Sequence, residues 1–65
     1  MQNNRDLIAE NLRHIHADRH ELAKQNAMAN PRPEYMLALV RGIAQSARLI
    51  EIMLENDNQT ATPNN

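Results

Sequence analysis

The stretch NPRPEYMLALVRG, residues 30–42, separates two segments that each have helical character. Proline disfavours helical geometry in the residue before it, and Pro31 and Pro33 therefore interrupt the helix twice within three residues. Pro33 also suits the first position of a new helix, because the backbone N–H that it lacks would have no partner there. The sequence predicts a chain reversal at residues 30–33 with a helix on either side.

The segment before the prolines carries apolar residues at helical spacing. They recur at intervals of four and three, and the spacing continues through two polar residues: Ile8, Leu12, Ile15, Arg19, Leu22 and Asn26. This period is typical of one face of a helix and differs from the alternation of a strand. Asn3 or Asn4 can cap the start, where the Asp6 carboxylate meets the positive end of the helix dipole. We expect a helix over about residues 4–29.

The segment after the prolines has two adjoining apolar faces. One comprises Met36, Leu39, Val40, Ile43, Ala47, Ile50 and Leu54, and the other comprises Tyr35, Ala38, Gly42, Ser46, Leu49 and Met53. Together they cover more than half of the helix circumference, whereas a helix with one neighbour needs only a narrower stripe. We expect this helix over about residues 33–56 and a disordered polar tail, DNQTATPNN, over residues 57–65.

These elements predict an all-α fold in residues 1–56, a two-helix antiparallel hairpin that completes its core by association with another chain. A domain of 65 residues rarely obtains more than about 3 to 5 kcal/mol from its own core. Without cysteine, the chain has neither disulfides nor a cysteine zinc site to add stability. If the turn centres on residue 31 or 32, Leu22 lies level with Val40, and Arg19 lies level with Ala44.

The two faces of the second helix give two sets of expected contacts. The expected core within the hairpin is Ile8, Leu12, Ile15, Leu22, Leu39, Val40, Ile43, Ala47, Ile50 and Leu54. The expected partner interface is Tyr35, Ala38, Gly42, Ser46, Leu49 and Met53. Gly42 has two interpretations, because glycine inside a helix costs about 1 kcal/mol relative to alanine and needs a reason. We favour the close approach of a second chain; in the alternative, Gly42 accommodates the first helix.

Composition excludes several classes of function. The formal net charge is −1, Tyr35 is the one aromatic residue, and the longest apolar run is the five residues 36–40. The sequence therefore predicts no membrane span and disfavours nucleic-acid binding. The lack of cysteine fits a reducing compartment, and the amino terminus lacks the apolar stretch of a secretion signal. We expect a cytoplasmic protein.

The residues that could carry chemistry form no convincing site. His16 and His20 are four residues apart and could reach one metal ion from a single helical face, but no carboxylate projects to the same spot. The chain also lacks a cysteine nucleophile and a glycine-rich phosphate loop, and two helices alone cannot enclose a substrate. We expect no metal site, no cofactor and no enzymatic activity.

Two sets of polar residues have more than one interpretation. Arg19 and Asn26 interrupt the apolar stripe, and as buried polar groups they would fix the register of the helices. In the alternative for Arg19, its aliphatic stem lies over Ala44 and Ala47 and its charged end reaches water. A basic stripe, Arg13, His16, His20 and Lys24, could contact phosphates, although Asp6 and Glu10 dilute its charge. The alternative function is a self-associating regulator, a four-helix-bundle homodimer, for which this stripe is the candidate RNA contact.

The second helix resembles one known family. The stretch NPRPEY at its start is followed by RGIAQSARLIEIM, which places a tyrosine just after the turn, small residues in mid-helix and clustered aliphatic residues beyond them. In this pattern, over residues 30–54, the chain is similar to the small YscE-like co-chaperones of bacterial type III secretion systems. The Pro-Arg-Pro turn and Gly42 are not part of the family pattern.

The resemblance implies a helix-turn-helix protein that pairs with a larger chaperone built of tetratricopeptide-like repeats and helps to keep the needle subunit soluble before export. It assigns Tyr35 and the apolar residues of the second helix to contacts with the partner or to the core. The expected function is accordingly a non-enzymatic co-chaperone, with a helical protein or a second copy of the chain as its partner.

Overall fold

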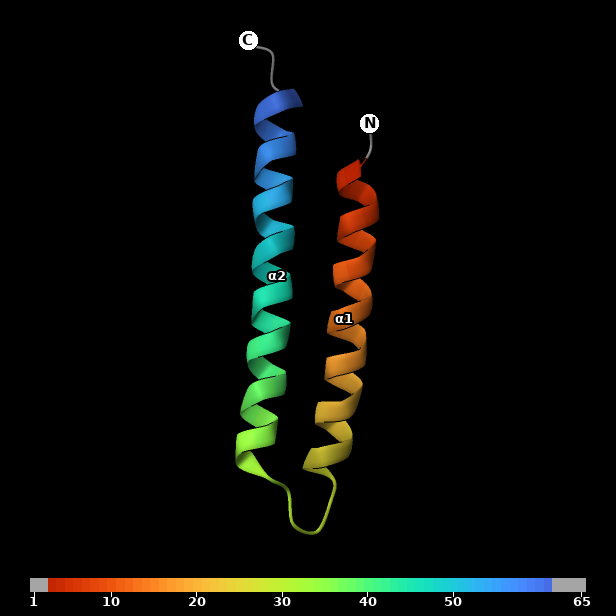
Figure 1. Ribbon diagram of the computed structural model, residues 1–65, viewed down its shortest axis with the longest axis vertical. Helices are drawn as coiled ribbons and strands as arrows, with labels where there is room; N and C mark the ends of the chain where they lie inside the picture. Colours follow the sequence, from red (N-terminus) through yellow and green to blue (C-terminus); the bar gives the residue numbers. More distant parts are fainter. Residues whose placement is uncertain (1–2, 62–65) are drawn as a thin grey trace.

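A computed structural model of the protein describes residues 3–61 and contains two helices, α1 (Asn3–Asn26) and α2 (Pro33–Ala61). The helices run antiparallel and lie side by side along most of their length, and one connection joins them at one end of the molecule (Figure 1). The described part of the chain contains no strand. The all-α hairpin is therefore confirmed.

The connection between the helices is longer than the sequence predicts. We expected α1 to continue to about residue 29, but it ends at Asn26, and residues 27–32 form the connection. The Ala27 N–H is shared between the carbonyls of Ala23 and Lys24, and the Met28 N–H donates to the Gln25 carbonyl three residues back. These shorter-range bonds tighten the last turn, and the chain leaves the helix before it reaches the prolines.

The far end of α2 also differs from expectation. Residues 57–61, which we expected to be disordered, continue the helix to Ala61, and residues 62–65 of the expected tail lie outside the described part of the chain. The Asn4 Nδ2 group of α1 reaches this segment and donates a hydrogen bond of 2.8 Å to Asp57 Oδ1.

The register of the hairpin is set by contacts at its middle and at its open end. A Cβ atom added at Gly42 would lie 2.7 Å from Asp18 Oδ2, so Asp18 is level with Gly42. The bond between Asn4 and Asp57 gives the same register within one residue. Arg19 is thus level with Arg41 and not with Ala44 as expected, because the connection 27–32 centres nearer to residue 30 than to 31 or 32.

The seam between the helices buries polar residues. Among the described side chains no apolar one is fully buried, whereas Gln25 and Ser46 are only 6% and 7% exposed. Glycine and serine in α2 let α1 approach closely at Gly42 and Ser46. The expectation that these two residues face a second chain is wrong, and the alternative interpretation of Gly42, that it accommodates the first helix, describes the structure.

Neither helix in the described part of the chain combines the length and the apolar character that crossing a lipid bilayer requires.

Candidate protein-interaction surface

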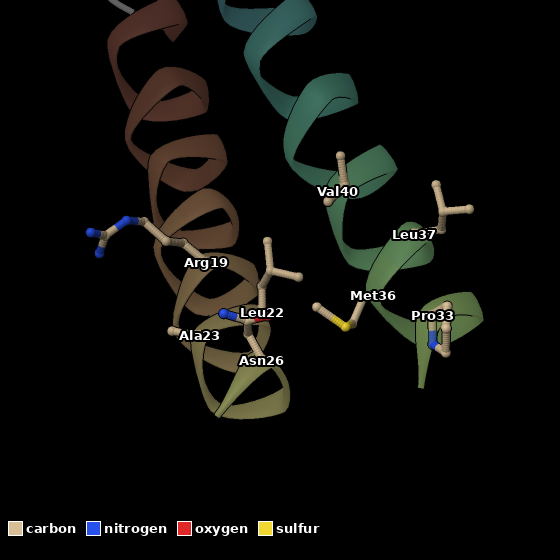
Figure 2. A pocket seen from close by; sticks show the side chains of 8 residues that line it. All are labelled: Arg19, Leu22, Ala23, Asn26, Pro33, Met36, Leu37 and Val40. Carbon is tan, nitrogen blue, oxygen red and sulfur yellow. The ribbon is translucent and has the colours of Figure 1, made fainter. Parts of the chain in front are cut away.

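An open apolar groove lies beside the seam near the connected end of the hairpin. Its volume is about 630 Å³, and both helices line it (Figure 2) with Arg19, Leu22, Ala23, Asn26, Pro33, Met36, Leu37 and Val40. Leu22 and Met36 point toward each other across the groove, while Arg19 points away from α2. The arginine thus stands at the rim, and the floor between the helices is apolar. We call this surface the apolar groove.

The apolar surface continues along the hairpin toward its open end. A second hollow, of about 520 Å³, lies on α2 and is lined by Ala47, Ile50, Glu51, Leu54, Glu55 and Asn58. Ala47 and Leu54 follow Val40 at intervals of seven residues, and Leu12 precedes Arg19 by seven, so these residues share the side of the apolar groove. Leu12 and Leu54 are both 53% exposed. The groove and these continuing residues together form what we call the apolar face.

The opposite side of the seam is polar. Its hollow is lined by Asn11, His14, Ala17, Asp18, Gly42, Gln45, Ser46 and Leu49. Leu7 and Ile52 lie on the same side, because they are seven residues from His14 and Gln45, and both are exposed. With Leu49 of the hollow, Leu7 and Ile52 form a small apolar cluster toward the open end, whereas most of the residues that line the hollow are polar. The two sides of the hairpin therefore differ in character.

The expected core residues divide between the seam and the apolar face. Ile8, Ile15, Leu22, Leu39, Ile43 and Ile50 are half-buried, as expected for residues beside a neighbouring helix. Leu12, Val40, Ala47 and Leu54 are exposed and belong to the apolar face instead. α1 is too narrow to cover this whole stripe, because its contact line on α2 runs through Gly42 and Ser46.

The expected partner interface is divided in the same way. Gly42 and Ser46 contact α1, and Tyr35 and Met53, which are seven residues from them, lie in the same line and are half-buried. Only Ala38 and Leu49 of the expected set are exposed. The unpartnered apolar surface therefore lies on the other side of α2 from the one that the sequence indicated.

Sequence reasoning missed a row of polar residues in the seam. Asn4, Asn11, Asp18 and Gln25 recur at intervals of seven residues on α1, and all four are buried or half-buried. We call them the polar row. A seven-residue period marks one line along a helix that faces a neighbour, so the recurrence was a usable signal. It was overlooked because the apolar stripe beside it has the same period.

The polar row makes specific contacts at three levels of the hairpin. Gln25 Oε1 accepts a hydrogen bond of 2.9 Å from the Arg32 backbone N–H, which ties the connection to the end of α1. Asp18 lies against Gly42, and Asn4 binds Asp57 at the open end. Each contact joins parts of the chain far apart along the helices or across the turn, so the row fixes the register.

Tyr35 anchors the connected end of the hairpin. The Arg32 guanidinium carbon lies 5.1 Å from the centre of the Tyr35 ring, a favourable position for a cation over an aromatic face. Burial raises the pKa of the Tyr35 phenol from its usual 10.0, and the charge of Glu21 and a hydrogen bond to it raise the pKa further, against the opposing effect of Arg32. The residue is thus held by groups of its own chain.

The basic stripe and the histidines lie on the exposed surface of α1. Arg13, His16, His20 and Lys24 are exposed, and Lys24 Nζ lies 3.8 Å from Glu21 Oε1, so a carboxylate accompanies this stripe. No group of three or more histidine, aspartate or glutamate side chains within residues 3–61 could hold a metal ion. The apolar face remains the strongest candidate for function.

Comparison of the chain with protein-family models finds no matching family, and comparisons with curated proteins and with solved structures find no match.

Proposed function

We propose that this protein is a non-enzymatic binding subunit that acts by joining its apolar face to the helices of another chain. The observation that carries the proposal is the distribution of its apolar residues. None of the described apolar side chains is fully buried, while Leu12, Leu37, Val40 and Leu54 are exposed on or beside the apolar groove. A continuous apolar surface of this kind is typical of an interface and would favour aggregation in a monomer.

The shape of the groove suits a helical partner. Two antiparallel helices present two ridges with an apolar depression between them, and an amphipathic helix can lay its apolar side into such a depression. A third and a fourth helix placed there would complete the layers of a helical bundle. The partner would then bury residues that α1 leaves exposed, chiefly Leu12, Val40 and Leu54.

The resemblance of residues 30–54 to the YscE-like co-chaperones narrows the proposal. In this form the partner is a tetratricopeptide-like chaperone of a type III secretion system, the complex keeps a needle subunit soluble before export, and the protein works in the cytoplasm. The aliphatic part of the resemblance, RGIAQSARLIEIM, includes Ala47 and Ile50 near the open end of the apolar face. Gly42 and Ser46 do not belong to the proposed interface, because they contact α1.

A matched pair of substitutions tests the proposed function. Val40 and Leu49 are 46% and 43% exposed, lie on the same helix and face opposite sides of the hairpin. The chain is co-expressed with a repeat chaperone and a needle subunit of a type III system, and the complex is isolated on the chaperone. We expect Val40→Lys to abolish co-purification and Leu49→Lys to preserve it.

Two other results would change the proposal. If the parent chain does not join the repeat chaperone, the secretion assignment fails. If in vivo cross-linking then also yields the same protein partners for the parent and for Val40→Lys, the apolar face is not a binding surface, and the wider proposal fails as well.

A further inference from the structure

We infer that, in the absence of another partner, the apolar face is covered by a second copy of this chain, which packs antiparallel to the first and forms a four-helix bundle. The inference rests on the proposed function, since it names an occupant of the same face. It adds that the free protein is a homodimer, so that a different helical partner would have to replace the second copy.

The apolar stripes of the two helices are close to symmetric along their length. On α1 the stripe of Ile8, Leu12, Ile15, Arg19 and Leu22 has spacings of four, three, four and three, and its middle is Ile15. On α2 the stripe of Met36, Val40, Ile43, Ala47, Ile50 and Leu54 has its middle between Ile43 and Ala47, at residue 45. The α2 pattern is therefore the same in either direction, and the α1 pattern reverses about Ile15 to within one residue.

The register of the hairpin aligns the two stripes with each other. Asp18 is level with Gly42, so Ile15, which is three residues earlier on α1, is level with Gln45 on α2. The middles of the two stripes therefore lie at the same height along the molecule. One two-fold axis at this level can therefore relate α1 to α1 of the second copy and α2 to α2 of the second copy. In a different register the middles of the two stripes would lie at different heights, and one axis could not relate both pairs.

This axis gives the stripe residues of both helices partners of suitable size. On α2 it pairs Met36 with Leu54 of the second copy and Val40 with Ile50 of the second copy. On α1 it places Ile15 beside its own equivalent. Ala44 and Ala47 lie close to the axis, and their small side chains let the two α2 helices approach as closely as the packing of bundles requires.

The one charged residue of the α1 stripe fits this arrangement. The axis places Arg19 of each chain beside Leu12 of the other, at the edge of the bundle. Arg19 is exposed and points away from α2 (Figure 2), so its aliphatic stem can cover the leucine while the guanidinium stays in water. The dimer therefore buries no unpaired charge at this position.

The area of the apolar face is sufficient for a dimer. The 24 residues of α1 make a helix about 36 Å long, and two helices side by side are about 20 Å wide, so one face of the hairpin covers roughly 700 Å². Stable protein interfaces bury about 600 to 1,000 Å² on each partner. The opposite side has a similar size, but its hollow is lined by Asn11, His14, Asp18 and Gln45, so a second copy packed there would have to cover more polar groups.

Sedimentation equilibrium of the full chain tests the inference. We expect a mass of twice the 7.4 kDa of one chain. Val40→Lys should weaken the dimer at least about 30-fold, the effect of losing one dominant interface residue. The matched variant Leu49→Lys should leave the mass unchanged. Because both side chains are already exposed, neither change should prevent the hairpin from forming, and circular dichroism at a concentration where each variant is soluble checks this.

A distance measurement tests the antiparallel arrangement. The chain has no cysteine, so Ala29→Cys places a single spin label on the exposed connection. The connection is about fifteen residues of helix from the level of the proposed axis, so the two labels should be about 45 Å apart. A parallel dimer would bring both connections to the same end, and a distance below about 25 Å would contradict the antiparallel bundle.

The outcomes separate this inference from the proposed function. A chain that is monomeric at every concentration overturns the homodimer, while loss of a repeat-chaperone complex in Val40→Lys alone would still support the proposed function. A dimer that Leu49→Lys dissociates and Val40→Lys does not would overturn both, because the polar side of the hairpin would then be the interface.

Discussion

The two edges of the seam between α1 and α2 have the same seven-residue period and opposite chemistry. On one edge Asn4, Asp18 and Gln25 of the polar row meet the Asp57 carboxylate, Gly42 and the Arg32 backbone N–H at defined positions. On the other edge Ile8, Ile15 and Leu22 are half-buried beside the apolar face. Polar contacts are directional and can fix which residues lie level, whereas apolar contacts are not. The polar edge therefore sets the geometry of the hairpin, and the apolar edge remains available for assembly.

The largest effect is expected at Gly42, where the polar edge leaves no room. Gly42→Leu inserts a side chain where even a Cβ atom lies 2.7 Å from Asp18 Oδ2. Overpacking of this kind costs about 3 kcal/mol, which exceeds the gain of about 1 kcal/mol from replacing a helical glycine. The net cost of about 2 kcal/mol removes roughly half of the about 3 to 5 kcal/mol that a core of this size supplies, so the urea midpoint should fall markedly while the hairpin stays folded in water. The measurement is urea denaturation followed by circular dichroism.

Ala38→Leu is the control for Gly42→Leu, because Ala38 is also small, lies on the same helix and is exposed. It should leave the urea midpoint nearly unchanged. Equal midpoints for the two leucine variants would mean that Gly42 does not face α1.

The next largest effect is expected at Gln25, which is buried and accepts the Arg32 N–H. Gln25→Ala leaves this backbone donor without its partner, at a cost of about 2 kcal/mol if water does not replace the amide. Gln45→Ala removes the same side chain from an exposed position and should change stability by less than about 0.5 kcal/mol. If both variants had the same free energy of unfolding, the polar edge would not hold the connection in place.

A smaller effect distinguishes crowding from flexibility at Gly42. Gly42→Ala alone should be close to neutral, because the gain in helix propensity of about 1 kcal/mol is offset by displacing the Asp18 carboxylate. In an Asp18→Ala background the same substitution should recover that gain of about 1 kcal/mol. A double-mutant cycle measured by urea denaturation gives the coupling, and a coupling of zero would contradict contact between the two residues.

The smallest effect is expected from the ionisation of Tyr35. Its pKa is raised above 10.0 in the folded hairpin by burial and by Glu21, so the protonated phenol stabilises the fold. This contribution is complete below pH 10 and is lost as the pH rises through the higher pKa of the folded state. We expect the parent chain to lose more stability than Tyr35→Phe between pH 9.5 and 11.5. Parallel pH profiles for the two proteins would exclude this role.

The number and direction of the helices could be predicted, because Pro31 and Pro33 interrupt a chain that otherwise has helical periodicity. The rotation of α2 about its own axis could not be predicted, because Gly42 fits equally well against a second chain and against α1. Apolar residues are usually inside, so the sequence predicts Val40, Ala47 and Leu54 as core residues. In the structure the polar row, which has the same seven-residue period, lies in the seam, and these three residues are exposed. The length of α2 was underestimated because nothing in its local sequence indicates the contact between Asn4 and Asp57.

The central claim is that the apolar residues of this hairpin form a surface that another chain covers, and not a core of their own. The most direct test is the thermal unfolding midpoint of the full chain, measured over about a hundredfold range of protein concentration. Association stabilises the folded state by mass action, so we expect the midpoint to rise steadily with concentration and Val40→Lys to remove most of this rise. A cooperative transition whose midpoint is the same at every concentration would show that the hairpin is stable alone and would contradict the account.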